Sequence, residues 1–222
     1  MYLDDGFGQN KVAQNHKRKY IKDIAKLWLG RSTMSKQAKT LTEQDVERVL
    51  AYIAKNKHPV RNRAMFLTML NTGVRISELV SISYFDAVDD EGNIRDEIML
   101  KAENTKTKEA RTIFVNTRLH KELTDYIAVY KPKSKTSKLF YSQKGDGFTA
   151  NTGAQLFHYL YRRVGLVTAS SHSARRTFIT NLSERCVGIR VIMSLSGHRQ
   201  LSSVQAYLDC NADQQRKAVN LL

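Results

Sequence analysis

The alternation of apolar and polar positions predicts a mainly helical chain from about residue 41 onward. Apolar residues repeat at helical spacing across residues 46–53, and Thr42 with Asp45 forms the pattern of a capping box that would begin this helix. A second helical pattern covers residues 61–73, where Gly73 is expected to end the helix because glycine readily adopts the left-handed conformation of a helix C-terminus. A further short helix is expected over residues 74–82.

A change of pattern between residues 96 and 116 predicts a small antiparallel sheet. Two β-rich runs, 98–101 and 112–115, are separated by a polar, lysine-rich turn, as in a β-hairpin. A basic loop over 131–147 follows, and the helical pattern then resumes at 152–165 and continues to the end. The expected fold class is therefore α+β, mainly α with one small antiparallel β-sheet.

Charge sets the first forty residues apart. Residues 1–40 carry nine Lys or Arg against three Asp, a net charge of +6, and residues 16–30 are compatible with a short basic helix ending at Gly30. We expect residues 1–40 to form a basic N-terminal arm, and residues 41–222 to form the main domain with a C-terminal tail.

The overall composition favours a polyanionic partner. The 222 residues include 36 Lys or Arg and 21 Asp or Glu, so the formal net charge is +15, and basic side chains near phosphates release condensed counterions. No apolar run approaches the length of a membrane span, the N-terminus is not a signal peptide, and Cys186 and Cys210 do not stand at zinc spacing. We therefore expect an intracellular protein that does not enter a membrane.

Two pairs of residues combine an arginine with a side chain that can orient it. Arg75 and Glu78 are three residues apart, so a helix would place them on one face, and a paired arginine keeps donors for an anion. His172 and Arg175 have the same spacing near an expected helix start, where free N–H groups favour anions. Taken singly, the first pair is better explained as a surface ion pair, and a capped surface helix explains the second.

A third cluster of reactive side chains lies toward the C-terminus. His198 follows Gly197, the expected end of a buried helix over residues 191–197, and Tyr207 stands nine residues further on. Tyr207 is one of ten tyrosines in the chain, and most tyrosines are half-buried packing residues with a hydrated hydroxyl. On its own the cluster therefore assigns no chemistry to Tyr207.

The clusters match a known family in order and in spacing. Residues 72–79 (TGVRISEL), 104–115 (NTKTKEARTIFV), 172–178 (HSARRTF) and 195–208 (LSGHRQLSSVQAYL) resemble the motifs of the tyrosine recombinases, also called the phage integrase family. The resemblance covers about residues 41–210 and implies the tyrosine recombinase catalytic domain fold. It describes a compact member, because only about forty residues stand where the family usually has a full-length N-terminal core-binding domain.

The resemblance implies a phosphate-binding pocket. Arg75 and Arg175 would hold the scissile DNA phosphate, His172 and His198 would complete the pocket through hydrogen bonding and proton transfer, and Glu78 would support the first arginine. Phosphoryl transfer depends mainly on positioning and on stabilising charge over the non-bridging oxygens, and guanidinium groups supply fixed charge for this purpose.

The resemblance also implies the nucleophile and the general acid. Tyr207 would attack phosphorus and form a 3′-phosphotyrosyl link, while Lys106, in the hairpin turn, would protonate the leaving 5′ oxygen; Lys108 is the alternative, because sequence does not fix the hairpin register. A free tyrosine hydroxyl has a pKa of about 10 and needs a base or a positive field to react. No cofactor or metal is expected, since the covalent link conserves the bond energy and the sequence has no P-loop, carboxylate cluster or zinc spacing.

Two positions depart from the family pattern, and two questions stay open. Arg176 stands where the family usually has histidine, and Ala174 stands where it usually has leucine. Residues 1–40 would form a basic arm or a reduced DNA clamp. The tail over residues 211–222 would dock on a neighbouring subunit or pack on its own domain.

The implied function is site-specific DNA recombination of the integrase or invertase type, by a prokaryotic, phage or mobile-element protein acting in the cytoplasm at the nucleoid. The implied partners are double-stranded DNA and accessory DNA-bending proteins. The implied oligomeric state is a homotetramer on DNA and a monomer or dimer when the protein is free. The alternatives are a type IB topoisomerase-like nicking and closing enzyme and a catalytically silent DNA-binding regulator on the same fold.

Overall fold

The computed structural model describes residues 38–105, 108–130, 132–134, 136–143, 145, 147–205, 207, 215–216 and 219–220. The chain divides into two units, Met1–Gln37 and Ala38–Leu222, and all described residues lie in the second. Lys106 lies outside the described residues, as do nearly all of the predicted N-terminal arm and most of the tail. The division of the chain at residue 41 into an arm and a catalytic domain stays a prediction.

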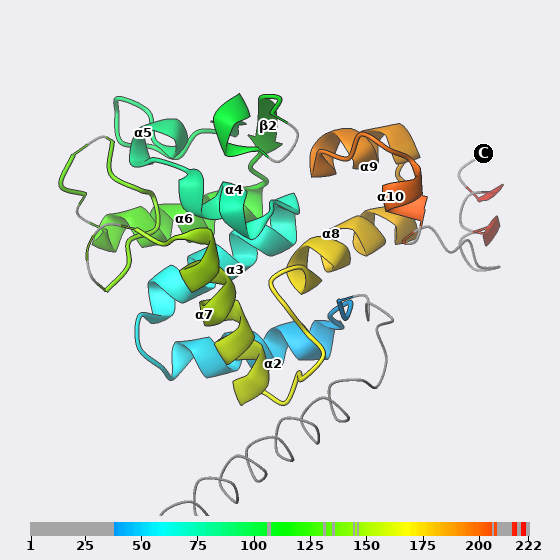
Figure 1. Ribbon diagram of the computed structural model, residues 1–222, viewed down its shortest axis with the longest axis horizontal. Helices are drawn as coiled ribbons and strands as arrows, with labels where there is room; N and C mark the ends of the chain where they lie inside the picture. Colours follow the sequence, from blue (N-terminus) through cyan, green and yellow to red (C-terminus); the bar gives the residue numbers. More distant parts are fainter. Residues whose placement is uncertain are drawn as a thin grey trace, which may run out of the picture. The chain divides into compact units, whose positions relative to one another are not determined.

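The described part is mainly helical with one two-stranded sheet, which confirms the expected fold class (Figure 1). In chain order the elements are α2 (Glu43–Ala54), α3 (Pro59–Thr72), α4 (Ile76–Ser81), α5 (Tyr84–Ala87), β1 (Glu97–Leu100), η1 (Ala102–Asn104), β2 (Arg111–Phe114), α6 (Thr117–Val129), α7 (Ala150–Arg163), α8 (Ser173–Glu184), α9 (Ile189–Ser196) and α10 (Ser202–Gln205). Helix α6 has no counterpart among the elements expected from the sequence.

Helix α3 is the centre of the fold, and α2, α4, α6 and α8 all pack against it (Figure 1). It is buried on nearly every side, so it lacks the polar face of a surface helix. Its buried polar side chains are satisfied locally. The Thr68 hydroxyl donates to the Ala64 carbonyl oxygen at 2.7 Å, and the Thr72 hydroxyl donates to the Thr68 carbonyl oxygen at 2.6 Å.

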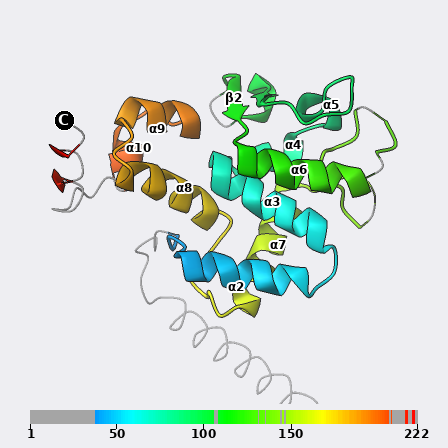
Figure 2. The same cartoon turned by 180° about the vertical axis from the view of Figure 1, so that it is seen from behind.

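Helices α8, α9 and α10 form a separate group beside the main core, which both Figure 1 and the reverse view in Figure 2 show. A small hydrophobic cluster holds this group together, with Ile179, Ile192 and Val204 fully buried at its centre. Tyr207 packs against this cluster just beyond the end of α10. The predicted nucleophile is therefore carried on a small helical group of its own.

Strands β1 and β2 form the antiparallel hairpin that the sequence predicts. Leu100 pairs with Arg111 at the end nearest the turn, and Ile98 pairs with Ile113 in the core. The turn is closed by Thr105, whose Oγ1 accepts a hydrogen bond from the Glu109 N–H at 3.1 Å. The two ends of the turn are thus joined by this hydrogen bond.

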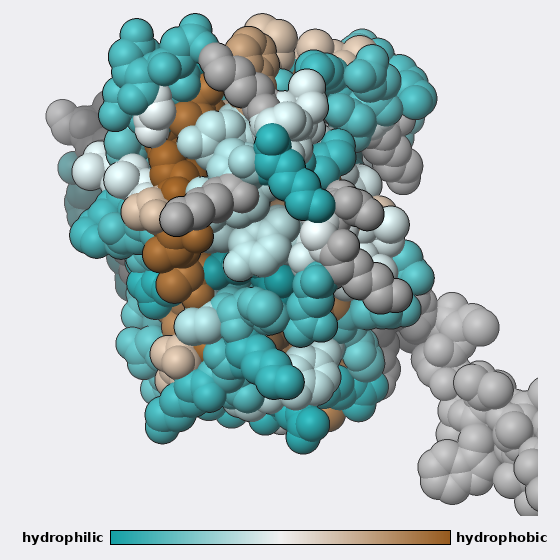
Figure 3. Space-filling view, turned by 90° about the vertical axis from the view of Figure 1, so that its left-hand side faces the viewer, coloured by the Kyte–Doolittle hydropathy of each residue, from teal (hydrophilic) through white to brown (hydrophobic). Residues whose placement is uncertain are grey.

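One face of the described part is largely polar. The face shown in Figure 3 is mostly hydrophilic, and its hydrophobic residues gather in one narrow band. Within the described ranges, no helix combines the length and the apolar character that crossing a bilayer requires.

Gly73 ends α3 at the place where this helix packs against α8. It ends α3 in the left-handed conformation, with φ +63°, as the sequence predicts. A Cβ atom at this position would lie 2.3 Å from Cδ1 of Phe178 on α8. Two constraints therefore require glycine here: the positive φ and the close approach of a neighbouring ring.

We expect Gly73→Ala to destabilise the protein far more than Gly165→Ala. Gly165 also has a positive φ, +78°, but a methyl group at that position would have no atom within 4 Å, so this variant reports the backbone strain alone, about 1 kcal/mol. At Gly73 the clash should add about 1–3 kcal/mol. Urea unfolding of the two variants measures the difference; equal losses would show that the ring of Phe178 yields without cost.

Candidate active site

The site begins at the N-terminus of α4, where Arg75 and Glu78 form one unit. Arg75 is the N-cap residue and Glu78 the third residue of the helix, and the Glu78 Oε2 accepts the Arg75 backbone N–H at 2.9 Å. The Arg75 side chain also donates through Nη1 to Glu78 Oε1 at 2.8 Å. The expected pairing of these two residues is confirmed, and Glu78 is wholly buried while the Arg75 side chain stays 16% exposed.

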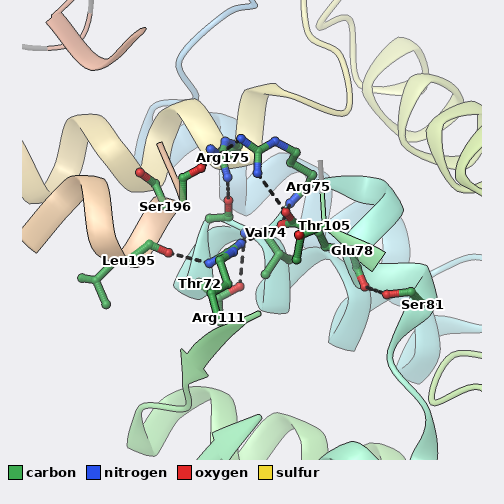
Figure 4. A network of polar contacts seen from close by, with 12 residues as sticks. Thr72, Val74, Arg75, Glu78, Ser81, Thr105, Arg111, Arg175, Leu195 and Ser196 are labelled. Atoms are coloured by element: carbon green, nitrogen blue, oxygen red, sulfur yellow. Dashed lines mark hydrogen bonds and ion pairs between the residues drawn. The ribbon is translucent and has the colours of Figure 1, made fainter. Parts of the chain in front are cut away.

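A second arginine, Arg111 at the start of β2, binds the same carboxylate. Its Nη2 lies 2.6 Å from Glu78 Oε2, and its Nη1 donates to the Leu195 carbonyl oxygen at 2.7 Å (Figure 4). Arg111 therefore connects the hairpin to α4 and to the end of α9. The sequence motif contained Arg111 but gave it no role. A signal was present, because Arg111 shares a strand face with the buried Ile113, and a charged residue on a core-facing side requires a buried partner.

The two guanidinium groups keep Glu78 ionised inside the protein. Burial alone would raise the pKa of Glu78, but the charge of Arg111, the Arg75 backbone N–H and the charge of Arg75 together hold that pKa below its ordinary value. A buried carboxylate with a guanidinium on each oxygen is well compensated.

Arg175 on α8 lies next to this pair but has no carboxylate of its own. It is 6% exposed. Its Nη1 donates to the Gly73 carbonyl oxygen at 2.6 Å, and its Nη2 lies 3.0 Å from Nε2 of His198. Among the described residues no Asp or Glu forms an ion pair with Arg175. Burial, followed by the nearby charge of Arg75, lowers the pKa of Arg175 to about 9, so this buried cation would be stabilised by an added anion.

His198 is neutral, and its tautomer follows from its neighbours. The Ser196 hydroxyl donates to the Ile192 carbonyl oxygen at 2.6 Å, so Oγ accepts from the Nδ1–H of His198, at 2.7 Å. Nε2 is left as the acceptor for Arg175. Burial, followed by the charges of Arg175 and Arg75, lowers the pKa of His198 to about 4. The imidazole therefore adds no charge near neutral pH.

Gly197 lets the end of α9 approach the arginines closely. It has φ +65°, and a Cβ atom here would lie 2.9 Å from Cδ of Arg111. Its carbonyl oxygen accepts a hydrogen bond from Nη2 of Arg75 at 3.3 Å. Carbonyl groups at a helix C-terminus carry partial negative charge, so this end of α9 is held by Arg75 and, through Leu195, by Arg111.

Of the other predicted site residues, His172 and Tyr207 are described and Lys106 is not. His172 is exposed at the N-cap of α8, one turn before Arg175, and its backbone N–H donates to Oγ of Ser170 at 3.2 Å. Tyr207 is half-buried, and the guanidinium of Arg176 lies over its ring. Lys108 is described, with its Nζ 3.4 Å from the Glu103 carbonyl oxygen. The catalytic roles expected from the sequence stay predictions for all six residues: Arg75, Lys106, His172, Arg175, His198 and Tyr207.

An ion pair also links the hairpin turn to the segment between His198 and Tyr207. Nη2 of Arg199 lies 2.5 Å from Oε1 of Glu109, and both side chains are more than half exposed. Exposed pairs of this kind contribute little energy. The contact shows only that Glu109 and Arg199 lie side by side.

Four separate segments thus assemble a cationic cluster of side chains. Arg75, Arg111 and Arg175 contribute three positive charges, and Glu78 contributes one negative charge. Since His198 is neutral, the assembly keeps an excess positive charge in a partly buried place. Guanidinium groups with free N–H donors match the oxygens of a phosphate group.

The comparisons with known proteins point in the same direction. The profile of the phage integrase family matches residues 39–214. The tyrosine recombinase XerA of Pyrococcus furiosus is 28% identical over 183 residues, which are 82% of this chain and 60% of that protein. The tyrosine recombinase XerD of Corynebacterium glutamicum is 26% identical over 162 residues, which are 71% of this chain and 51% of that protein. The chain therefore spans about half to three fifths of the length of these curated relatives.

Solved structures show the same fold. The crystal structure of XerA recombinase matches with a TM-score of 0.63 at 22% identity, covering 86% of this chain and 65% of that one. The Tn1549 transposon integrase, solved in complex with transposon right end DNA, matches with a TM-score of 0.69 at 21% identity, covering 85% of this chain and 67% of that one. The expected tyrosine recombinase catalytic domain fold is confirmed.

We expect Glu78→Gln to lower the free energy of unfolding by about 3 kcal/mol or more, because it leaves clustered, partly buried guanidinium groups without a counter-charge. The matched control is Glu122→Gln. Glu122 also binds an arginine, Arg63, through both oxygens, but that arginine is 42% exposed, so about 1 kcal/mol or less is expected. Denaturant unfolding at neutral pH measures both, and similar losses would contradict the central place of Glu78.

Proposed function

The chain belongs to the phage integrase family, and on this premise we propose that it is a site-specific DNA recombinase of the integrase or invertase type. It would cleave and rejoin double-stranded DNA through a covalent 3′-phosphotyrosyl intermediate. The observation that carries the proposal is the pocket around Glu78, in which the buried Arg175 lacks an acidic partner among the described residues and lies beside Arg75. A phosphodiester would supply the missing negative charge.

In the proposed cleavage step, Arg75 and Arg175 bind the non-bridging oxygens of the scissile phosphate. The Tyr207 hydroxyl attacks phosphorus, and the bond from phosphorus to the 5′ oxygen breaks. His172 accepts the phenol proton, while the general acid protonates the leaving 5′ oxygen. His198 holds Arg175 in place as a neutral hydrogen-bond acceptor, since its Nδ1–H is already bonded to Ser196.

Rejoining is the reverse reaction on a new strand. A free 5′ hydroxyl attacks the phosphotyrosyl phosphorus and gives its proton to the general acid, which cleavage left deprotonated. The bond from phosphorus to Tyr207 breaks, and His172 returns the proton to the phenol. The phosphodiester energy is conserved in the covalent link, so exchange needs no nucleotide. This chain's residues position the groups and stabilise charge, which are the main requirements of phosphoryl transfer.

We assign the general acid to Lys106 rather than Lys108. The support is indirect: Lys108 adopts a left-handed backbone conformation, with φ +57°, and its amine lies near the Glu103 carbonyl oxygen within its own hairpin. Thr105 and Glu109 fix the base of the turn beside the pocket. An ammonium near several arginines would have a lowered pKa, which suits proton donation.

Exchange between two duplexes requires four strand cleavages, so we propose a homotetramer on DNA, with a monomer or dimer when free and with DNA-bending proteins as accessory partners. The Tn1549 transposon integrase and the XerH recombinase were each solved in complex with DNA. A DNA substrate of this kind would place the protein at the nucleoid of a prokaryotic cell. The alternatives are topoisomerase-like nicking and closing, and DNA binding without cleavage.

Tyr207→Phe should abolish formation of a covalent protein–DNA adduct while leaving DNA binding intact, because only the attacking oxygen is removed. Adducts trapped in SDS from a library of nicked duplexes of random sequence, followed by sequencing of the trapped DNA, test this and reveal the site. Tyr84→Phe, on α5, is the control and should still form adducts.

The same experiment separates the alternatives. Enrichment of one sequence supports a recombinase, whereas adducts without sequence preference indicate a topoisomerase-like enzyme. Absence of any adduct from the wild type, with DNA binding retained, indicates a regulator. An adduct that survives Tyr207→Phe would overturn the assignment of the nucleophile.

Lys106→Ala should slow cleavage by roughly 10²-fold or more on ordinary DNA, which is the usual contribution of a general acid. A 5′-bridging phosphorothiolate, whose sulfur leaves without protonation, should restore the rate. Lys108→Ala serves as the matched control and should change the rate little on either substrate. The reverse pattern would assign the acid to Lys108.

A further inference from the structure

Arg176 contacts the predicted nucleophile directly. Its Cζ lies 4.9 Å from the centroid of the Tyr207 ring, so the guanidinium covers one face of the phenol. A cation over an aromatic face is attracted by the negative potential of the ring. Arg176 follows Arg175 on α8 and therefore projects from a different side of the helix. One helix thus presents one arginine to the phosphate pocket and the next to the tyrosine.

The same guanidinium is oriented by the segment that leads into α2. Nε of Arg176 donates to Oγ1 of Thr40 at 3.0 Å. The next residue along, Leu41, is buried, and its N–H donates to Oγ1 of Thr177 at 2.8 Å. Residues 40 and 41 are therefore fastened to two consecutive residues of α8. These contacts restrict the directions in which the Arg176 side chain can point.

The Tyr207 ring is held from a second direction by apolar residues. It packs against the cluster that contains Ile179, Ile192 and Val204, and its backbone N–H donates to the Val204 carbonyl oxygen at 2.8 Å. The ring is therefore held between the Arg176 guanidinium and this apolar cluster.

We propose that Arg176 is a positioning residue that holds the Tyr207 ring for attack and is itself aligned by Thr40. This inference rests on the proposed function of Tyr207 as the nucleophile. Arginine suits the task because its planar group can stack on a ring while its edge donates a hydrogen bond, whereas a lysine ammonium can do only one of these at this distance. A fixed ring lowers the entropic cost of bringing the phenol oxygen into line with phosphorus.

The stack can be tested in the free protein, without DNA or activity. In protein labelled with ¹⁵N-arginine, the ring current of Tyr207 should shift the Arg176 side-chain NMR signal upfield. Tyr207→Leu should remove this shift, and Tyr207→Phe should keep it because the ring remains. Thr40→Val should change the signal by loosening the guanidinium. A signal identical in wild type and Tyr207→Leu would overturn the proposal.

The functional effect is measured as the single-turnover rate of adduct formation at saturating DNA, together with the Kd for DNA. Arg176→Ala and Arg176→Lys should each slow adduct formation by roughly tenfold, in line with the loss of a partly desolvated cation–π contact, with the Kd close to that of the control. The control is Arg118→Ala, which removes the same charge from an exposed position on α6. Thr40→Val should slow the reaction less, and not further when combined with Arg176→Lys.

The outcomes separate positioning from general stability and from the proposed function. An unchanged rate in Arg176→Ala, a faster one, or a loss of affinity without a loss of rate would each overturn the positioning role. If the wild type forms no adduct at all, the proposed function fails, and the ring-current comparison alone decides whether Arg176 holds Tyr207.

Discussion

The site depends on one buried carboxylate. Glu78 accepts hydrogen bonds from Arg75 on one side and from Arg111 on the other, and both arginines continue to carbonyl groups at the end of α9. Without that negative charge, the guanidinium groups would repel one another within a partly buried volume. With it, Arg75, Glu78 and Arg111 form one connected frame. Arg175 lies beside this frame, and its positive charge has no acidic partner among the described residues. The fold therefore holds a surplus of positive charge in place, and such a surplus favours a bound anion.

The frame also explains why the backbone takes its particular form at two glycines. Gly73 offers its carbonyl oxygen to Arg175 and leaves room for Phe178, and Gly197 lets α9 end against Arg111. At each place a helix ends in a left-handed residue so that a guanidinium can reach a carbonyl oxygen. Local backbone geometry and the electrostatics of the site are thus parts of the same arrangement.

Much of this arrangement was predictable from the sequence, because its signals are local. Capping residues, glycine stops and alternating runs predicted α2, the ends of α3 and α9, and the hairpin, and the spacing of Arg75 and Glu78 predicted their contact. The contacts that were not predicted span long separations. Arg111 meets Glu78 from 33 residues away, and Arg176 meets Thr40 from 136. The spacing of residues along the sequence does not predict such long-range contacts. The tautomer of His198 likewise depends on Ser196 and Arg175, which only the folded structure places beside it.

Long separations in the site have a consequence for the cell that makes the protein. Arg75 contacts Gly197 across 122 residues, and Arg175 contacts Gly73 across 102. A chain still emerging from the ribosome has its first arginine long before the segments that complete the pocket, and Tyr207 is synthesised after all of them. Incomplete or partly unfolded chains consequently lack the assembled arginine cluster. Any activity that depends on this cluster is therefore confined to chains that have been completed and correctly folded.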